Sequence, residues 1–505
     1  MVPEPPSPHL GPGSQFTSTQ LTAAGSLPAL WAARWEAEPE APTLRILNQP
    51  WCSAAELDER TRFAAARLAA VGIGAGDRVV WSTATSLDAV VACLGALRLG
   101  AVVVPVNPRY SEHELTHVLT DVRPRGAVVE RTDQAGWVRA SVPEAAVLTP
   151  ALEPRRAALP GRTQDGTPLT LDSAGPRDPA LIVYTSGTTG APKGAVLDHG
   201  NLLAGAATLG LAWRWEPEDC LVLALPLFHV HGLCAGLFGT LASGASAVLV
   251  EYFDADTVLE ACGAGGTLFF GVPTMYHRFV ALSSVGELAR LRLCVSGSAP
   301  LASALWHRVQ ELAGVCVLER YGMTETLLTI SNPYEGERRP GTVGFPLPGV
   351  EVRLEPEGEG ELVVRGPSVF AGYWERPAAT ADAFAEGWFK TGDIVAADAD
   401  GYLSIRGRRG DLIISGGFNV YPAEVEDALL GHPGVLEVAV TGTESAEWGQ
   451  EVTAWVVASG DAPSSDELLA FGAERLAPYK RPRTVRFVDA LPRNAMGKVQ
   501  RADLA

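Results

Sequence analysis

The feature that most constrains the fold is an alternation of strand-like apolar runs with helix-like patterns along the N-terminal part of the chain. Ser53 and Glu56 have the spacing of a capping box, which predicts a helix beginning directly after Ser53. Residues 78–82 and 101–106 have the apolar composition of buried strands, and the pattern between them, at 87–99, is that of a helix. This strand–helix–strand order predicts parallel sheets covered by helices, and therefore an α/β fold.

The pattern changes near Arg408, which predicts a second and smaller unit. A helix is expected at 422–430, because a proline opens this stretch and a glycine follows its end. Strands are expected at 436–440 and 451–457. A segment of this size with mixed elements is typical of a small α+β domain.

We therefore expect three parts: a flexible lead-in at 1–25, a large domain at 26–408 and a small mobile domain at 409–505. The lead-in is rich in proline and has no basic residue before Arg34, unlike a secretion signal. Gly410 suits a hinge between the two domains, since glycine absorbs large backbone rotations. An ordinary turn glycine is the alternative interpretation of Gly410.

The charge balance excludes two classes of partner. The chain has 505 residues, with 40 basic and 58 acidic side chains, and so a formal net charge of −18. Nucleic acids and anionic membranes are bound by clustered basic side chains, and we expect neither as a partner. The seven cysteines are scattered without a CxxC pair, which is typical of reduced thiols in a cytoplasmic protein.

Residues 221–250 carry no formal charge and are long enough to cross a membrane. However, Pro226, His229 and His231 interrupt the first half, and the second half is rich in small residues. A buried strand followed by a core helix has the same hydropathy, and we favour that interpretation over a membrane span.

The most informative stretch for function is an apolar strand that enters a loop of glycines and hydroxyls and then reaches a lysine. The backbone N–H groups of such a loop form an anion-binding nest, and the hydroxyls and the ammonium add donors for a polyphosphate. The stretch is not a Walker motif, whose lysine is followed by Ser or Thr. The candidate phosphate ligands are Thr185, Ser186, Gly187, Thr188, Thr189 and Lys193.

This loop resembles the signature of the acyl-adenylate-forming superfamily, which includes acyl-CoA synthetases and luciferases. Further stretches match that family in the expected order between residues 181 and 498. The chain before residue 181 fits in length and alternation but carries no comparable motif. The matching stretches are Tyr321-Gly-Met-Thr-Glu325, Gly341-Thr-Val-Gly344, Lys390-Thr-Gly-Asp393, Gly407-Arg408, Gly416-Gly-Phe-Asn-Val-Tyr-Pro422 and the segment 492–498.

The resemblance implies an AMP-forming acyl-CoA synthetase that uses ATP, Mg²⁺ and coenzyme A. A carboxylate first attacks the α-phosphate of ATP, giving an acyl-adenylate and pyrophosphate, and the thiol of coenzyme A then displaces AMP. The first step needs cations and hydrogen-bond donors, because an anion must approach a tetra-anion. A carrier protein is the alternative acceptor to coenzyme A.

The resemblance also implies a role for each matching residue at the nucleotide. Thr324 contacts the α-phosphate, and Glu325 helps to hold Mg²⁺, a hard cation that prefers oxygen ligands. Tyr321 lies near adenine, and Asp393 accepts hydrogen bonds from the ribose. Lys498 is the mobile adenylation lysine of the small domain. The remaining implied nucleotide residues are Ser298, Ala299, Glu319, Arg320, Gly322 and Arg408.

For the second step, the resemblance implies a rotation of the small domain, in which Lys498 leaves and the loop after Ser415 enters. The family's hinge residue is usually Asp or Lys, and Gly410 departs from that pattern. The implied coenzyme A residues are Ser415, Gly416, Gly417 and Lys480.

The sequence constrains the identity of the acid substrate less than that of the nucleotide. Residues 225–232, 271–278, and 320–321 followed by 331–339 are similar to stretches of malonyl-CoA synthetases, in which the residue matching Arg278 pairs with the second carboxylate. A buried guanidinium facing the acid suits a dicarboxylate, because it offers two parallel hydrogen bonds. Malonate or methylmalonate is favoured, and a bulkier apolar or natural-product acid is the alternative. The candidate acid-site residues are His229, Arg278, Ser296, Met323 and Thr324.

His229 and His231 have the spacing of an HxH metal pair, but the sequence offers no evident third ligand. We favour a gate at the acid site or buried core histidines over a metal site. In the role of a gate, His229 is a candidate catalytic residue together with Lys498, Thr324 and Glu325. Glu325 is the one expected metal ligand.

Overall fold

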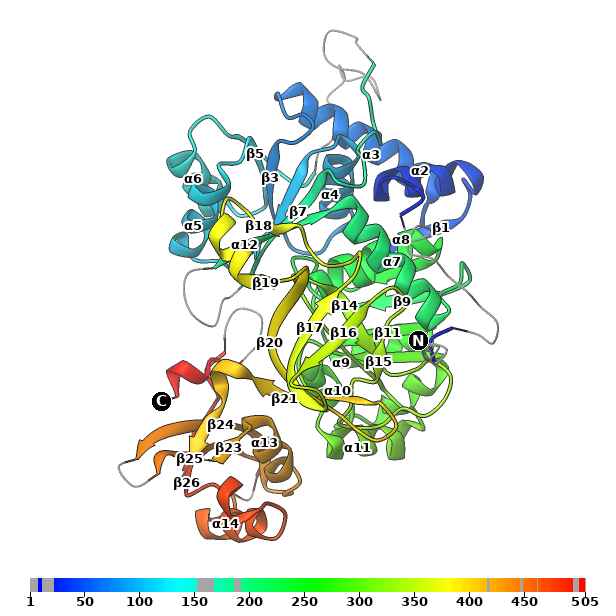
Figure 1. Ribbon diagram of the computed structural model, residues 1–505. Coiled ribbons are helices and arrows are strands. Elements are labelled where there is room, and N and C mark those ends of the chain that lie inside the picture. The colour runs from blue at the N-terminus through cyan, green and yellow to red at the C-terminus, as the bar shows by residue number, and fades with distance from the viewer. Residues whose placement is uncertain are drawn as a thin grey trace, which may run out of the picture.

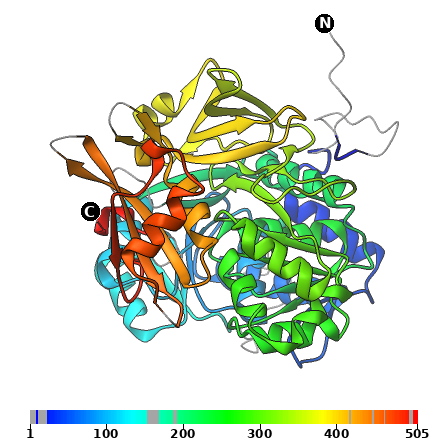
Figure 2. The same ribbon diagram turned by 90° about the horizontal axis from the view of Figure 1, so that it is seen from below.

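The structure is a computed structural model that describes residues 8–10, 22–151, 168–185, 192–415, 418–445, 448–460, 462–493 and 499–504. A large α/β part is followed by a small α+β part at the C-terminal end of the chain (Figure 1). The small part lies below the large one in Figure 1, and it therefore lies in front of the large part in the view from below (Figure 2). The expected fold class is confirmed.

A nine-stranded sheet forms one half of the large part. In sheet order its strands are β15 (Phe345–Pro346), β14 (Leu327–Ser331), β13 (Leu318–Met323), β12 (Leu293–Ser296), β11 (Leu268–Gly271), β9 (Cys220–Leu223), β10 (Ser246–Leu249), β1 (Pro42–Ile46) and β2 (Cys52–Ser53). The strands from β13 to β1 are parallel, as the alternation predicted. Their carboxyl ends therefore meet along one edge of the sheet.

A seven-stranded sheet forms the other half. In sheet order its strands are β18 (Gly372–Tyr373), β8 (Lys193–Asp198), β7 (Pro179–Thr185), β4 (Val102–Pro105), β3 (Arg78–Ser82), β5 (Gly126–Val129) and β6 (Ala146–Leu148). The strands predicted at 78–82 and 101–106 are β3 and β4, and they pair in parallel. By contrast, β7 and β8 form an antiparallel hairpin, whose connection is the glycine and threonine loop.

Helices cover these two sheets (Figure 1). Those of the large part are α2 (Leu27–Ala37), α3 (Ala54–Ala70), α4 (Leu87–Arg98), α5 (Glu112–Val122), α6 (Thr132–Ser141), α7 (His199–Trp213), α8 (Gly239–Ser243), α9 (Ala255–Gly263), α10 (Pro273–Phe279), α11 (Ser303–Ala313) and α12 (Pro377–Ala383). The capping box predicted at the start of α3 is present, with Glu56 N donating to Ser53 Oγ at 3.2 Å and Ser53 N to Glu56 Oε2 at 2.8 Å. The face that α3 buries includes Leu57 and Leu68, each worth about 1.5–3 kcal/mol.

A third sheet of the large part is antiparallel and was not foreseen by the prediction of parallel, helix-covered sheets. Its strands are β16 (Glu351–Glu355), β17 (Glu359–Arg365), β20 (Trp388–Ala397), β19 (Phe384–Ala385) and β21 (Leu403–Arg408). In β16 exposed residues alternate with half-buried ones, as expected for a strand with one face in solvent.

The small part has a sheet of β23 (Phe418–Val420), β22 (Ile413–Ser415), β25 (Gly449–Ala458), β24 (Val435–Ser445) and β26 (Thr484–Phe487). Its helices are α13 (Pro422–Leu430) and α14 (Ser465–Ala473). The helix predicted at 422–430 and the strands predicted at 436–440 and 451–457 are confirmed as α13, β24 and β25. Val425 and Leu429 of α13 are fully buried against this sheet.

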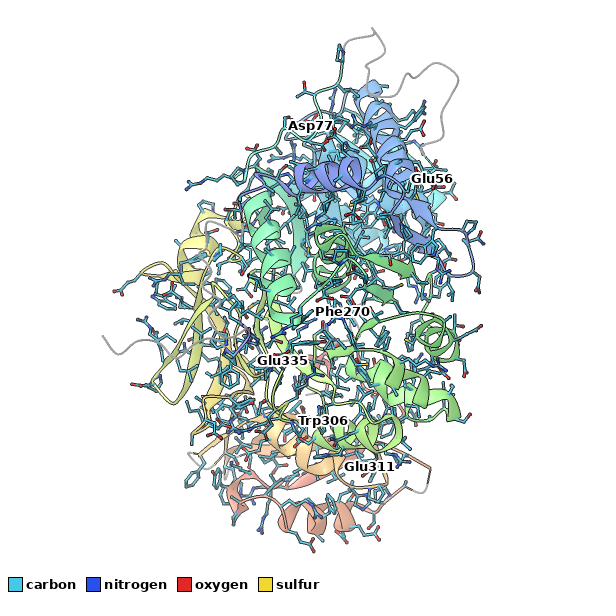
Figure 3. The ribbon with its side chains drawn as sticks, turned by 90° about the vertical axis from the view of Figure 1, so that its right-hand side faces the viewer. Glu56, Asp77, Phe270, Trp306, Glu311 and Glu335 are labelled. Carbon is cyan, nitrogen blue, oxygen red and sulfur yellow. The ribbon has the colours of Figure 1, made fainter. Side chains whose placement is uncertain are left out.

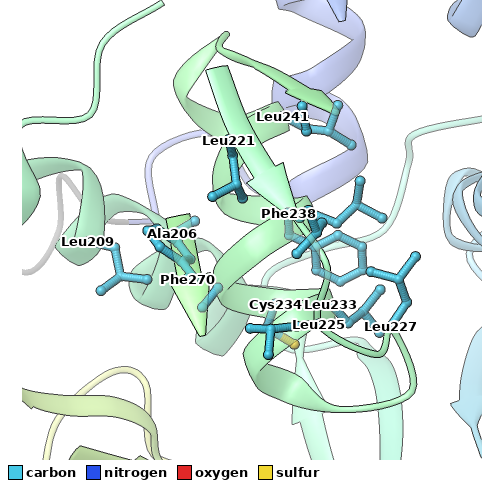
Figure 4. Packing of buried hydrophobic residues seen from close by; sticks show 14 of the residues in the cluster. Ala206, Leu209, Leu221, Leu225, Leu227, Leu233, Cys234, Phe238, Leu241 and Phe270 are labelled. Carbon is cyan, nitrogen blue, oxygen red and sulfur yellow. The ribbon is translucent and has the colours of Figure 1, made fainter. Parts of the chain in front are cut away.

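The uncharged segment 221–250 lies in the core of the large part. It contains most of β9, a π-helix (His231–Phe238), α8 and β10, which confirms a buried strand followed by core helix. Leu233, Phe238 and Leu241 are at most 1% exposed and pack with neighbouring apolar side chains (Figure 4). Among the described residues, no helix combines the length and the apolar composition needed to span a membrane.

Candidate active site

The predicted phosphate loop joins β7 to β8 at the edge of the seven-stranded sheet. Thr185 and Lys193 face each other across this hairpin, and Thr185 Oγ1 donates to the carbonyl of Lys193 at 3.4 Å. Gly194 is required there, since a Cβ would lie 2.6 Å from a methyl group of Ile182. The predicted ligands within the loop, Ser186, Gly187, Thr188 and Thr189, lie outside the described residues.

Tyr373 connects two predicted ligands that are distant in sequence. Its hydroxyl donates to Glu325 Oε1 at 2.9 Å, and the Lys193 ammonium lies 5.3 Å from the centre of its ring. The backbone N–H of Phe370 also donates to the carbonyl oxygen of Glu325 at 2.7 Å. The sequence analysis missed Tyr373, which belongs to none of the motifs and reaches the site because β18 pairs with β8.

Glu325 has the donor chemistry expected of a magnesium ligand. Its side chain is 5% exposed, and burial raises the pKa of its carboxyl. A nearby dication would favour the ionised form, whose oxygens suit Mg²⁺. Because Mg²⁺ is commonly held by one or two carboxylates and substrate phosphates, one protein carboxylate is sufficient here. The described residues contain no cluster of three or more potential metal ligands, and the HxH pair is not part of one.

The predicted ribose and adenine residues form one hydrogen-bonded group. Tyr321 OH donates to Asp393 Oδ2 at 2.5 Å, and Arg408 Nε donates to Asp393 Oδ1 at 2.7 Å. Arg408 also donates to the carbonyl of Thr391 at 3.2 Å, and the Thr391 hydroxyl accepts from the backbone N–H of Asp393. Burial and the Asp393 carboxylate raise the pKa of Tyr321, so its hydroxyl keeps its proton. We call this group the nucleotide end of the site; its polar side chains hydrogen-bond to one another.

Three acid-site candidates lie at or directly after the carboxyl ends of β12 and β13: Ser296, Met323 and Thr324. His229 lies between β9 and the π-helix. Ser296 pairs in register with Gly271 on one side and with Glu319 on the other. Parallel α/β sheets bind ligands at such strand ends. Phe270, near the end of β11, lies in the interior of the large part (Figure 3) and stacks on His231 with the ring centres 6.4 Å apart.

Both histidines are neutral; His231 is buried and His229 is half-buried. His231 Nδ1 lies 3.2 Å from Ser298 Oγ, and its Nε2 has no hydrogen-bond partner among the described residues. Burial lowers the pKa of His229 to about 4 and that of His231 well below its usual value, with Arg320 lowering the latter further. The Nε2 atom of His229 and the hydroxyl of Ser296 are likewise buried without a partner among those residues.

Glu319 and Arg320 are adjacent in β13, and each is 5% exposed. Glu319 Oε1 accepts from the backbone N–H of Leu301 at 2.9 Å, and burial raises the Glu319 pKa to about 8. Burial also lowers the pKa of Arg320 to about 9. Because side chains alternate along a strand, Arg320 points to the opposite face from Tyr321 and its ribose group. Its guanidinium packs against Gly297, which lies between Ser296 and Ser298.

The end of β13 and the residue that follows it contain the other motif residues. Gly322 approaches the next strand so closely that a Cβ would lie 2.0 Å from the carbonyl oxygen of Leu327. Met323 and Thr324 follow it and are half-buried. Ser298, which is exposed like Ala299, has a left-handed backbone with φ of 70°. Such strain occurs preferentially at functional sites.

Arg278 differs from its prediction. The sequence analysis expected a buried guanidinium facing the acid, but Arg278 is exposed on α10, with its guanidinium 5.7 Å from the ring centre of Phe253. The prediction of burial is therefore wrong for this arrangement of the chain. It failed because a local motif does not determine which face of a short helix turns to the core.

The small part contributes the predicted coenzyme A residues. Ser415 is buried, whereas Gly416 and Gly417, like Lys498, lie outside the described residues. Lys480 donates to both carboxylate oxygens of Glu424, at 2.6 and 2.7 Å. A polar cavity of about 260 Å³ separates the two parts at this point and is lined by Glu359, Arg406, Tyr421, Glu424, Tyr479 and Lys480. Gly410 has an ordinary φ and open space beside its Cα.

Comparison with known proteins identifies the family. The family model described as AMP-binding enzyme matches residues 31–374, and that of the AMP-binding enzyme C-terminal domain matches residues 424–498. A malonate–CoA ligase of Mus musculus is 37% identical, over 85% of this chain and 81% of its own length. A feruloyl-CoA synthase of an Amycolatopsis species is 38% identical, over 89% of this chain and 92% of its own length.

A solved structure supports the same assignment. The crystal structure of ATP-bound MatB from Rhodopseudomonas palustris is 37% identical and superposes with a TM-score of 0.86. The match covers 95% of this chain and 98% of that one. The chain therefore belongs to the family of AMP-binding enzymes, and the expectation of an AMP-forming acid–CoA ligase is confirmed.

Proposed function

We propose that the acid on which this ligase acts is malonate or methylmalonate. The observation that carries the proposal is the polar character of the acid end: Ser296, His229 and His231 are at or near the strand ends, each with a buried polar atom that has no partner among the described residues. A bulky apolar acid would leave those atoms unpaired, which costs free energy, whereas carboxylate oxygens accept hydrogen bonds.

Similarity alone does not distinguish the acids, because the relatives named for malonate and for a feruloyl group are almost equally identical to this chain. The stretches at 225–232 and 271–278 favour malonate, since they are similar to those of malonyl-CoA synthetases. A bulkier acid is the alternative, and a carrier protein is the alternative acceptor. No feature of the described residues favours the bulkier acid or the carrier protein.

The first step joins the acid to AMP. A carboxylate oxygen attacks the α-phosphorus, the bond from that phosphorus to the bridging oxygen breaks, and pyrophosphate leaves with the electron pair. Lys193 and Thr185 border the loop that would hold the pyrophosphate portion, and Thr324 and Lys498 would stabilise charge at the α-phosphate. Mg²⁺ held by Glu325 would neutralise phosphate charge when bound.

The second step forms the thioester. The sulfur of coenzyme A, having lost its proton, attacks the acyl carbon, and AMP leaves with the electron pair of the acyl–oxygen bond. We propose that the domains at 26–408 and 409–505 rotate about Gly410 between the steps. The open space beside Gly410 supports this, because glycine is not required by the backbone or by packing in the present arrangement. Ser415, Gly416, Gly417 and Lys480 would then approach coenzyme A.

A panel of carboxylic acids tests the proposal, with pyrophosphate release and CoA thioester formation measured separately. We expect malonate and methylmalonate to support both reactions with kcat/KM at least about tenfold above that of butanoate or ferulate, a difference of about 1.4 kcal/mol in transition-state binding. Turnover confined to bulky monoacids would contradict the malonate assignment. Pyrophosphate release without thioester formation would instead indicate another acyl acceptor.

A further inference from the structure

Helix α5 contacts both strands that border the phosphate loop. Thr185 at the end of β7 and Lys193 at the start of β8 form the last pair of the hairpin ladder among the described residues. Directly before Lys193, Pro192 has no backbone N–H with which to continue the ladder. Its carbonyl oxygen lies 3.1 Å from Nε2 of His117 on α5. Because a carbonyl oxygen only accepts hydrogen bonds, His117 is the donor.

The next turn of α5 contacts the other strand. Tyr184 OH donates to Asp121 Oδ2 at 2.6 Å, and the Tyr184 ring packs edge to face with that of His117, with the ring centres 6.1 Å apart. Burial and the Asp121 carboxylate raise the pKa of Tyr184, so this hydroxyl keeps its proton and remains the donor. His117 and Asp121 are four residues apart on the helix and therefore lie on one face. One face of α5 thus contacts both β7 and β8 beside the loop.

Asp121 also connects to a third strand. Arg376 Nη2 donates to Asp121 Oδ1 at 2.5 Å, and the Asp121 side chain is only 10% exposed. Arg376 closely follows Tyr373 of β18, whose hydroxyl bonds to Glu325 and whose ring lies near Lys193. The strands β18, β8 and β7 are neighbours in that order, and α5 lies beside β18 and α12 (Figure 1). Asp121 therefore bridges the two strands on either side of β8.

The opposite side of α5 is anchored in the core. Leu115 and Leu119 are fully buried there. A capping box fixes the start of the helix, with Ser111 N donating to Glu114 Oε2 at 2.8 Å and Glu114 N to Ser111 Oγ at 3.4 Å. A helix held in this way is a rigid support for the groups that contact its other side.

We propose that His117 and Asp121 are positioning residues for the pyrophosphate portion of ATP. They hold β7, β8 and β18 beside the loop, and so set the spacing between Lys193 and the Tyr373–Glu325 pair. This inference rests on the proposed function, in which Lys193 borders the pyrophosphate portion and Glu325 holds Mg²⁺. AMP has no pyrophosphate portion, so the effect is restricted to ATP, to pyrophosphate and to the first reaction step.

The test compares Asp121→Ala and His117→Ala with the control His113→Ala, which removes an exposed histidine one turn earlier on the same helix. The first two variants should raise the KM for ATP and the Kd for pyrophosphate roughly tenfold, because misplaced groups bind the phosphates less well. The Kd for AMP should change by less than about twofold in each of them. His113→Ala should leave all three constants unchanged. His117→Gln should recover most of the loss, because its side-chain amide keeps a donor.

The two half-reactions provide a second measurement. In Asp121→Ala and His117→Ala, kcat for pyrophosphate release should fall roughly tenfold, since the leaving pyrophosphate is held less precisely. Thioester formation from coenzyme A and a supplied adenylate, made from the acid that the wild type uses, should change by less than about twofold. Pyrophosphate takes no part in that step. An equal loss in both half-reactions, or equal losses of AMP and pyrophosphate affinity, would show a general structural role and overturn the inference.

A Lys193→Met variant separates this inference from the proposed function. If Lys193→Met weakens pyrophosphate binding and neither α5 variant does, the inference alone is overturned. If the α5 variants weaken it and Lys193→Met does not, the inference is supported and the role proposed for Lys193 is wrong. No effect in any of these variants overturns both. Thermal midpoints verify that each variant is folded, and if Asp121→Ala does not fold, the comparison of His117→Ala with His117→Gln decides.

Discussion

The two ends of the active site satisfy their polar groups in different ways. At the nucleotide end, Tyr321, Asp393 and Arg408 bond to one another before any substrate is present. At the acid end, His231 and Ser296 have buried polar atoms that have no partner among the described residues. We propose that the nucleotide end is preorganised by the protein and that the substrate completes the acid end. The predictions below test this contrast, beginning with the largest expected effect.

Lys498→Ala tests the separation of the two reaction steps. We expect pyrophosphate release with malonate to fall roughly 1000-fold, because a cation that stabilises charge in the first transition state is lost. Thioester formation from supplied malonyl-adenylate should be retained, since Lys498 is proposed to leave before that step. Both rates are measured by quenched-flow sampling, and an equal loss in both would count against a domain rotation between them.

Arg98→Met and Arg320→Met compare two buried arginines: Arg98 forms ion pairs with Asp172 and Asp58, whereas Nε and Nη2 of Arg320 have no partner among the described residues. Removing Arg98 leaves Asp172 without its cation and leaves Asp58 with Arg62 alone, and we expect a loss of about 3–5 kcal/mol in unfolding free energy. Arg320→Met removes a charge that has no ion-pair partner among the described residues, and it should cost little or no stability. Denaturant titration of both variants provides the comparison, and equal destabilisation would show that Arg320 has a structural partner.

Asp393→Ala disrupts the preorganised nucleotide end. We expect the KM for ATP to rise roughly 100-fold, because the ribose loses its acceptor and Arg408 loses its partner. The affinity for malonate, measured calorimetrically, should change by less than about twofold if the two ends are independent. A parallel loss in malonate affinity would indicate that the ends are coupled.

Tyr373→Phe removes one hydrogen bond and keeps the ring against Lys193. The hydroxyl bonds to Glu325 at 2.9 Å, and its loss should reduce kcat roughly tenfold and weaken the apparent Mg²⁺ dependence. A Mg²⁺ titration at saturating ATP measures both quantities. An unchanged Mg²⁺ titration would show that the Tyr373 hydroxyl does not contribute to the site.

Glu319→Gln tests the pH dependence of stability. The raised pKa of about 8 means that folded Glu319 holds a proton which the unfolded chain, with a value of 4.5, releases. Its contribution is therefore complete below pH 4.5 and is lost as the pH rises through 8. His229 acts oppositely, since its pKa is lowered to about 4 and its contribution is lost as the pH falls from 6.5 through that value. Urea midpoints between pH 5 and 9 should vary less steeply in Glu319→Gln.

Local sequence signals predicted much of this molecule. The capping box of α3, the buried strand β3 and the proline at the start of α13 depend on neighbouring residues, and the structure confirms them. Tyr321, Asp393 and Arg408 come from three separate motifs, and their order in the family was sufficient to predict that they meet.

The remaining features depend on tertiary pairing. Tyr373 lies in the site because β18 pairs with β8, and no local sequence pattern predicts this pairing. Arg320 was grouped with the nucleotide by its neighbour Tyr321, yet alternation along β13 places it on the other face. Arg278 was expected to be buried, and the packing of α10 leaves it exposed.

The most direct test of the central claim is a single turnover in the absence of coenzyme A. Enzyme in excess of ATP is mixed with malonate and Mg²⁺, and pyrophosphate and protein-bound adenylate are quantified over time. The account predicts a burst of about one pyrophosphate per ATP bound, matched by malonyl-adenylate and absent without malonate. No burst with malonate, or release of ADP instead of pyrophosphate, would contradict it.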